Sequence, residues 1–327
     1  MSAQQGSSFR GRPVVALCGG VGGAKLALGL ERLLGADLTV IVNTGDDFEH
    51  LGLHVSPDID TVLYTLSGLS DIERGWGRAD ESWNFMTSLA DLGGETWFRL
   101  GDRDLAMHVE RTRALRGGAS LTDFTATMAS RLGIAASILP MSDDRVETMV
   151  VTTDGLLPFQ RYFVDLQCAP IVKRLEFRNA ERVAASSQVL AALYDPSLAA
   201  VIICPSNPYL SIDPVLAISD IRKALGDVTA PIVAISPLIG GQSVKGPTAK
   251  IMAELGVPAD SVSIARHYGF IDGFVIDETD RDDAGRIELP TLVTSTWMRS
   301  LKDRDRLAAE CMDFAMRLAN AEGRKVT

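Results

Sequence analysis

Four glycines lie within five residues near the start of the chain: Gly19, Gly20, Gly22 and Gly23. They follow the apolar run 14–18 and precede a stretch with helical spacing. Glycine lets a backbone turn sharply and lets a ligand approach its N–H groups, and a helix N-terminus favours an anion. We therefore predict a phosphate-containing ligand here. The segment lacks the last glycine of the dinucleotide fingerprint and the Lys-Ser/Thr pair of the P-loop, so a connecting glycine turn is the alternative.

Carboxylates cluster after the next apolar run, 38–42: Asp46, Asp47, Asp58 and Asp60. Carboxylates beside a phosphate repel it unless a divalent cation lies between them. Magnesium is usually held by one or two carboxylates together with phosphate oxygens. We predict Asp46 and Asp60 as Mg²⁺ ligands and Asp47 as a group that supports the metal or accepts a proton; turn formation and helix capping are the alternatives.

Two later apolar runs also end in loops rich in small and polar residues. In the first, Asn207 can offer a donor and an acceptor to the edge of a base. In the second, Lys245 stands just before a helix opened by Pro247, where a phosphate oxygen could bind. Turn chemistry alone is the alternative for both loops.

Aromatic side chains concentrate in residues 76–98: Trp76, Trp83, Phe85, Trp97 and Phe98. They could form an apolar wall for a planar ring system, or pack the core of their own region. Arg99 and Arg103 follow at once, and such arginines at a cleft suggest recognition of a carboxylate or phosphate. Surface solvation is the competing interpretation.

The elements that must position these residues alternate between apolar runs and helical patterns. We predict strands at 14–18, 38–42, 199–204, 231–236, 261–265, 273–277 and 291–294. Several are uninterrupted apolar stretches, as in strands covered on both faces, so we predict an α/β fold with a doubly wound, mostly parallel sheet. Ligands of such sheets gather beyond the carboxyl ends of the strands.

The chain divides into a core and an insertion. Residues 13–66 and 181–327 are predicted to form the core, and 1–12 a loose polar tail. Residues 67–180 are predicted to form a cap built of helices, at 103–116 and 121–132, and of a hairpin around Asp154-Gly155. A single helix is predicted from Asp213 to Gly226.

Composition limits the function classes. The chain has 327 residues, 46% of them hydrophobic, and a net charge of −10, which argues against a nonspecific nucleic-acid surface and an anionic membrane surface. The four cysteines are far apart, which suits a reduced, cytoplasmic setting. No stretch reaches membrane-spanning length. The four histidines show no metal-binding spacing, and we interpret His50 and His54 as ordinary loop residues.

Taken together, these segments resemble the 2-phospho-L-lactate transferase family, which serves biosynthesis of the deazaflavin coenzyme F-420. The resemblance runs in order over nearly the whole chain and is carried by CGGVGGAKLALGL, VNTGDDFEHLGLHVSPDIDTVLYTL, GGETWFRLGDRDLAMHVERT, LPMSDDRVETMV, PSNPYLSIDPVLAI, SPLIGGQSVKGPTAK and ARHYG.

The resemblance implies a Rossmann-like fold and a specific reaction. Family members transfer a phospholactyl or phosphoenolpyruvyl group from a GDP-linked donor to the deazaflavin alcohol Fo and release GMP; they need Mg²⁺ and are usually dimers. On this basis the donor nucleotide is expected at Gly19, Gly20, Gly22, Gly23, Lys25, Ser206, Asn207, Pro208, Gly240, Gly241 and Lys245. The deazaflavin is expected at Asp46, Asp60, Trp97 and Arg99, and Asp46 or Asp47 is expected to assist deprotonation of the acceptor hydroxyl.

Two other functions remain as alternatives. A related family of nucleotide-sugar-binding regulatory proteins shares the glycine segment, and such a protein would bind without turnover. A nicotinamide-dependent oxidoreductase would need an acidic residue at the end of the second strand, where this chain has Asn43. The sequence does not distinguish a lactyl from an enolpyruvyl donor.

Overall fold

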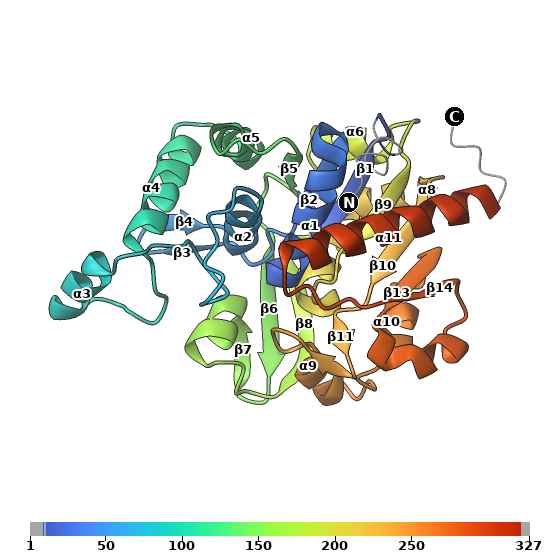
Figure 1. Ribbon diagram of the computed structural model, residues 1–327. Coiled ribbons are helices and arrows are strands. Elements are labelled where there is room, and N and C mark those ends of the chain that lie inside the picture. The colour runs from blue at the N-terminus through green and yellow to red at the C-terminus, as the bar shows by residue number, and fades with distance from the viewer. Residues whose placement is uncertain (1–8, 10, 322–327) are drawn as a thin grey trace.

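The computed structural model describes residue 9 and residues 11–321, and its centre is a seven-stranded sheet (Figure 1). The strand order is β14-β13-β10-β9-β1-β2-β5, and every neighbouring pair is parallel. These strands are β1 (Val14–Cys18), β2 (Leu38–Val42), β5 (Ser137–Pro140), β9 (Ala200–Ile203), β10 (Ile232–Ile235), β13 (Gly273–Ile276) and β14 (Thr291–Val293). The strand order reverses beside β1, which confirms the predicted Rossmann-like, doubly wound α/β fold.

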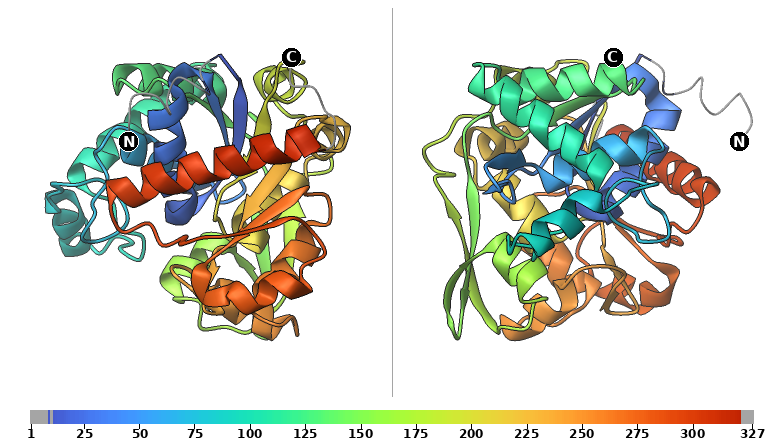
Figure 2. Two further views of the ribbon diagram at one scale, coloured as in Figure 1. Left: turned by 45° about the vertical axis from the view of Figure 1, so that its right-hand side comes forward. Right: turned by 90° about the vertical axis from the view of Figure 1, so that its left-hand side faces the viewer.

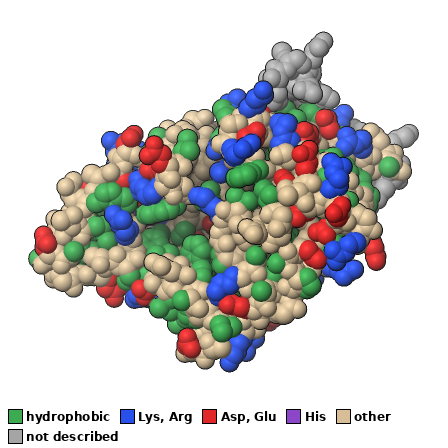
Figure 3. Space-filling view, turned by 60° about the horizontal axis from the view of Figure 1, so that its bottom comes forward, with side chains coloured by type: hydrophobic (Ala, Val, Ile, Leu, Met, Phe, Trp, Pro, Cys, Tyr) green, Lys and Arg blue, Asp and Glu red, His purple; other side chains and the backbone are tan. Residues whose placement is uncertain are grey.

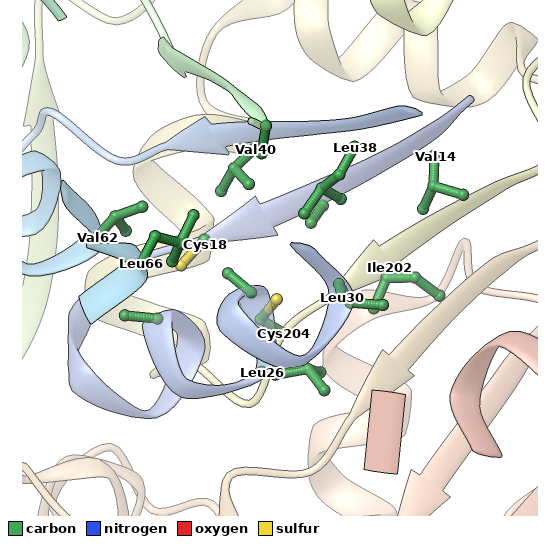
Figure 4. Packing of buried hydrophobic residues seen from close by; sticks show 14 of the residues in the cluster. Val14, Cys18, Leu26, Leu30, Leu38, Val40, Val62, Leu66, Ile202 and Cys204 are labelled. Atoms are coloured by element: carbon green, nitrogen blue, oxygen red, sulfur yellow. The ribbon is translucent and has the colours of Figure 1, made fainter. Parts of the chain in front are cut away.

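One face of the sheet is covered by α1 (Gly20–Leu34), α2 (Pro57–Leu66), α5 (Leu121–Arg131) and α11 (Leu301–Ala321). Figure 2 shows α11 lying across this face. The predicted apolar stripe of α1 is buried and packs on the strands. Figure 4 shows Leu26 and Leu30 of α1 beside Val14, Leu38 and Ile202 of the strands.

The opposite face is covered by α6 (Ser187–Leu193), α7 (Asp213–Leu216), α8 (Ser219–Asp227), α9 (Thr248–Glu254) and α10 (Ser261–Tyr268). Alternate residues of β1, such as Val15 and Leu17, point into this second core, whereas Val14 and Ala16 point into the first. Both faces are therefore buried, which explains the uninterrupted apolar runs.

The region 67–180 contributes to the core as well as to the rim of the molecule. It contains α3 (Asn84–Asp91), α4 (Asp102–Arg116), and an antiparallel sheet of β6 (Glu147–Thr152), β7 (Gly155–Pro158) and β8 (Val172–Arg178). The hairpin predicted at Asp154-Gly155 is confirmed, since Thr152 pairs with Gly155. However, β5 lies in the same region and pairs with β2 in the central sheet, so this stretch is not a purely inserted cap.

Short elements complete the chain. They are the hairpins β3 (Phe48–His50) with β4 (Leu53–Val55) and β11 (Leu238–Ile239) with β12 (Gln242–Ser243), and the short helices η1 (Gly35–Asp37), η2 (Arg161–Asp165), η3 (Pro208–Ile212) and η4 (Glu278–Arg286). Among the described residues, none of the helices has both the length and the apolar character needed to cross a lipid bilayer.

The prediction of a strand at 261–265 is wrong, because this segment begins α10. Asp260 caps the helix by accepting a hydrogen bond from the Ser263 backbone N–H at 2.8 Å. Val262, Ile264 and Ala265 are buried on the helix, so an apolar run of this length fits either element.

Two further predictions need adjustment. The helix expected from Asp213 to Gly226 is divided into α7 and α8. The loose tail predicted at 1–12 falls mostly outside the described residues, but Phe9 is buried in the first core.

Close contact between α1 and α11 depends on Gly29. A Cβ atom at this position would lie 2.3 Å from the backbone oxygen of Arg304. We predict that Gly29→Ala lowers the free energy of unfolding by about 1–3 kcal/mol, because the two helices must move apart. The control is Gly226→Ala in α8, where a Cβ has no atom within 4 Å. There alanine is expected to be neutral or to stabilise by up to about 1 kcal/mol in chemical denaturation. Equal destabilisation by both substitutions would contradict this account of the helix contact.

Candidate functional site

A cavity of about 710 Å³ lies at the carboxyl ends of β1, β2, β9 and β10. Its size is in the range of small-molecule sites. Most of the predicted site residues line it: Gly19, Gly20, Gly22, Lys25, Asp46, Asp60, Trp97, Arg99, Ser206, Asn207 and Lys245. Gly23, Asp47, Pro208, Gly240 and Gly241 do not. In Figure 3 hydrophobic side chains gather around a hollow with Lys and Arg side chains at its rim.

The glycine segment is tied to two neighbouring loops. Ser206, after β9, accepts a hydrogen bond from the Gly19 N–H at 3.1 Å and donates one to its carbonyl at 2.8 Å. Asp58, at the start of α2, accepts one from the Gly20 N–H at 2.8 Å. The first two N–H groups of the segment are therefore bonded within the protein.

Close packing explains two other glycines. A Cβ at Gly22 would lie 2.5 Å from the Pro205 carbonyl oxygen, and a Cβ at Gly23 would lie 2.4 Å from Ser206 Oγ. Gly22 thus permits the loop after β9 to approach the cavity, and Gly23 permits α1 to pack on the sheet.

Two buried carboxylates are close enough to interact: Asp46 in the loop after β2, and Asp58 at the start of α2. Asp46 is 7% exposed, and its Oδ1 has no hydrogen-bond partner among the described residues. Burial and the nearby charge of Asp58 raise the pKa of Asp46 well above its ordinary value. Asp58 accepts a hydrogen bond from Asn43 Nδ2 at 2.9 Å, but burial still raises its pKa to about 6. Neither carboxylate forms an ion pair with a described residue, so the pair lacks a balancing cation.

Asp47 lies behind this pair. Its Oδ2 accepts a hydrogen bond from Ser56 Oγ at 2.6 Å and lies 3.2 Å from His54 Nε2. Of the two adjacent aspartates that we predicted as catalytic, only Asp46 faces the cavity. Asp47 instead joins the β3–β4 hairpin to the start of α2, and His54 lies in β4 rather than in an irregular loop.

Asp60 has a different electrostatic environment from Asp46. The fully buried Arg111 of α4 donates to both of its carboxylate oxygens. His108 Nδ1 lies 3.7 Å from Asp60 Oδ2, and its Nε2 lies 3.3 Å from Asp104 Oδ2. Ligand atoms of Asp60, Asp104 and His108 lie within 4.8 Å of one another, but the Arg111 guanidinium already balances the charge of Asp60.

The loop after β9 offers fewer contacts to a base than the sequence suggested. Asn207 Oδ1 accepts hydrogen bonds from the backbone N–H groups of Tyr209 and Leu210, at 3.0 and 3.1 Å, and so caps η3. Its Nδ2 is buried and has no partner among the described residues. Asn207 therefore presents one free donor in the cavity and not a donor–acceptor pair.

Gly240 and Gly241 form a turn that is held away from the cavity. Both have positive φ and donate their N–H groups to Asp280, at 3.0 and 3.1 Å. Lys245, further along the same loop, reaches the cavity and donates to the Gly75 carbonyl oxygen at 2.8 Å.

Lys25 forms the positive part of the cavity together with Lys245. Lys25 Nζ donates to the Met298 carbonyl oxygen at 3.3 Å. Burial, together with the charges of Arg304 and Lys245, lowers the pKa of Lys25. None of the described carboxylates forms an ion pair with Lys25 or Lys245, so this region suits an anion.

The aromatic residues divide into two groups rather than one wall. Trp97 packs with Phe48, His50 and Phe98, at ring distances of 5.1 to 6.0 Å. Trp83 packs instead against Trp76, and the Arg99 guanidinium lies 4.2 Å from its ring centroid. Trp76, Trp97, Phe98 and Arg99 line the cavity, whereas Trp83 and Phe85 do not.

Sequence reasoning missed Asp58 and the α4 cluster. Asp58 was placed in the carboxylate cluster without a role of its own, with helix capping as the alternative, although its carboxylate accepts a hydrogen bond from the glycine segment. Asp104, His108 and Arg111 are spaced by four and three residues, which places them on one face of a helix. That spacing was a usable signal, but only the fold brings this face against Asp60.

The chain is similar in sequence to several transferases. The chain is 42% identical over 283 residues to a phosphoenolpyruvate transferase of Streptomyces griseus, covering 84% of this chain and 87% of the relative. It is 37% identical over 319 residues to one of Streptomyces coelicolor, with 94% and 99% covered. It is 40% identical over 277 residues to one of Mycobacterium tuberculosis, with 78% and 83% covered.

A solved structure and a family model complete the comparison. A UPF0052 family protein of Bacillus halodurans superposes with a TM-score of 0.60 at 16% identity, covering 92% of this chain and 98% of that one, which shows a shared fold. The family model for 2-phospho-L-lactate transferase CofD matches residues 14–290. The chain therefore belongs to the 2-phospho-L-lactate transferase family and is a transferase of the phosphoenolpyruvate and phospholactate type.

Proposed function

We propose that this protein transfers a phosphorylated three-carbon acid from a GDP-linked donor to the terminal hydroxyl of the deazaflavin alcohol Fo, releasing GMP and forming a phosphodiester. The observation that carries the proposal is the buried cavity carboxylate Asp46, whose Oδ1 has no hydrogen-bond partner among the described residues and which is near the charge of Asp58. Family membership supplies the reaction class, and Asp46 supplies the group that the reaction needs.

A divalent cation fits this pair of carboxylates. Two buried aspartates without a balancing cation are costly, and Mg²⁺ prefers carboxylate and phosphate oxygens. Asp46 and Asp58 would hold it, and when bound it would neutralise charge on the phosphate oxygens. We predicted Asp60 as the second ligand, but the charge of Asp60 is already balanced by Arg111, so we place the proposed site at Asp46 and Asp58.

The donor and the acceptor would occupy different parts of the cavity. Lys25 and Lys245, which have no carboxylate partners among the described residues, would bind the charged part of the donor, with Ser206 and Asn207 close to its nucleoside. Trp97 and Arg99 would contact the flat acceptor. We do not extend the nucleotide contacts to Gly240 and Gly241, because Asp280 holds their N–H groups.

The transfer itself needs alignment and a proton acceptor. The terminal hydroxyl oxygen of the acceptor attacks the phosphorus that bears the three-carbon acid. The bond from this phosphorus to the bridging oxygen breaks, and GMP leaves. The hydroxyl proton passes to the oxygen of the Asp46 carboxylate that does not hold the cation. Asp47 does not face the cavity and would act only through the structure of the loop.

We further propose that the three-carbon acid is enolpyruvyl. The support is that relatives of 37 to 42% identity are named phosphoenolpyruvate transferases. A homodimer and a cytoplasmic location remain expectations from the family resemblance and composition.

The activity test is direct. Wild-type protein with Mg²⁺, Fo and the enolpyruvyl donor is expected to give GMP and a product whose mass equals Fo plus the phosphoenolpyruvyl group. Asp46→Asn is expected to lower kcat by about a hundred- to ten-thousand-fold, because a general base contributes a factor of this order. Asp47→Asn is the matched control and should keep most of the activity. Normal turnover by Asp46→Asn would refute the assigned role, and faster reaction with the lactyl donor would refute the donor assignment.

Magnesium should stabilise the folded protein even without substrates. A cation at a hundred times its Kd adds about 2.7 kcal/mol, so Mg²⁺ is expected to raise Tm in wild type and in Asp47→Asn, but not in Asp46→Asn. Burial raises the pKa of Asp58 to about 6, above its unfolded value. Ionisation of Asp58 therefore lowers the free energy of unfolding as pH rises toward 6. Below about pH 6, protons compete with Mg²⁺ for the Asp58 carboxylate. The Mg²⁺-induced rise in Tm should be larger at pH 7.5 than at pH 5, as scanning calorimetry can show; an equal rise in all three proteins would place the cation elsewhere.

A further inference from the structure

The α4 helix places Asp104 in the wall of the cavity. The neighbours of Asp104 determine its orientation and its charge. Asp104 lines the cavity, and its side chain is 18% exposed. The Tyr64 hydroxyl donates to Asp104 Oδ1 at 2.6 Å. Asp104 Oδ2 lies 3.3 Å from His108 Nε2, and this contact holds it on one side. Because a carboxylate oxygen has more than one lone pair, Oδ2 can still accept a further hydrogen bond from a ligand in the cavity.

His108 has a defined orientation and tautomer. Arg111 Nη1 lies 3.3 Å from His108 Nδ1, and because a guanidinium only donates, Nδ1 must accept. A neutral His108 ring therefore carries its proton on Nε2, on the side of Asp104. His108 is only 1% exposed, and this Nε2 has no hydrogen-bond partner among the described residues. Arg111 is held in turn by Asp60, so the cluster is fixed from behind.

Asp104 remains ionised in this setting. Burial raises its pKa, but contacts with His108 and Tyr64 and the charge of Arg111 outweigh burial, so its pKa lies below the ordinary value. The cavity wall therefore presents an ionised carboxylate, and the buried His108 ring lies behind it with Nε2 on the side of Asp104.

The distribution of charge indicates which substrate this pair meets. Asp104 and Asp60 repel phosphates, whereas Lys25 and Lys245, which lie near each other in the same cavity, attract them. The aromatic side chains Trp97 and Phe98 line the same cavity as Asp104. An uncharged, flat ligand with hydrogen-bond donors along one edge suits a carboxylate in this position.

We infer that Asp104 is a specificity-determining residue that binds the acceptor substrate, its Oδ2 accepting a hydrogen bond from an N–H or O–H group of a flat, uncharged polyol-bearing ring. His108 is a positioning residue that holds Asp104, and Arg111 in turn holds His108. This inference rests on the proposed function, since it takes the acceptor to be a deazaflavin alcohol.

Binding of Fo, measured by isothermal titration calorimetry without donor, tests the inference. Asp104→Asn is expected to weaken the Kd for Fo by about ten- to a hundred-fold, as for loss of a hydrogen bond to a charged group, and to leave the Kd for GDP within threefold of wild type. The matched control is Asp102→Asn. Asp102 lies two residues earlier, bonds Ser82 and the Phe85 N–H, and does not line the cavity, so this variant should bind Fo as wild type does.

Two further arms distinguish the donor on the ligand and guard against misfolding. An Fo analogue methylated at the ring imide nitrogen should bind wild type and Asp104→Asn equally if that N–H is the donor. An analogue without the polyol chain should do so if a hydroxyl is the donor. Should Asp104→Asn fail to fold, Asp104→Glu moves the oxygen by one methylene with its charge retained, and should show the same selective loss.

The outcomes that overturn the inference are distinct from those that overturn the proposed function. Fo binding by folded Asp104→Asn within twofold of wild type, or equal loss in Asp102→Asn, refutes the role of Asp104 alone. Failure of wild type to bind Fo while it binds GDP refutes the acceptor of the proposed function, and the inference with it.

Discussion

The structure of this cavity depends on two buried carboxylates that no described basic residue balances. Asp46 and Asp58 lie where β2 and α2 meet the glycine segment, and the Gly20 N–H and Asn43 partly stabilise Asp58. Those hydrogen bonds do not offset burial, which is the main reason that the pKa values of both groups are raised, and the charge of Asp58 adds to the effect at Asp46. A folded protein that retains such a pair gains from anything that supplies positive charge there. This electrostatic need is what the proposed Mg²⁺ ion would meet.

The fold places both lysines and carboxylates around one cavity. The reversal of strand order beside β1 brings the loops after β1, β2 and β9 together. Lysines from α1 and from the loop before α9 and the carboxylates of α2 and α4 then line the same cavity. In the proposed function the lysines bind the charged part of the donor, and Asp104 of α4 binds the acceptor. Such prior alignment is the main requirement of phosphoryl-type transfer.

The local sequence was enough to predict most strands of the core, but not the partners of individual side chains. Uninterrupted apolar runs identified most of the central strands, because both faces of the sheet are buried. The segment 261–265 was predicted as a strand because its short apolar run fits the spacing of a strand and that of a helix. In the structure it is helical, and Asp260 caps this helix. Asp60 was assigned to a metal because carboxylates attract cations, but Arg111 lies 51 residues away and reaches it only through the fold. Asn207 shows the same limit. Its side chain was expected to hydrogen-bond the edge of a base, but in the structure its oxygen caps η3.

A crystal structure of the protein with Mg²⁺, GDP and Fo bound together would test the central claim most directly. The measured quantity is the distance from the terminal hydroxyl oxygen of Fo to the distal phosphorus of GDP. The account predicts about 3–3.5 Å, the separation of reacting atoms in a near-attack arrangement, with Asp46 beside that oxygen. The two ligands lying in separate cavities, or the cation bound away from Asp46, would contradict it.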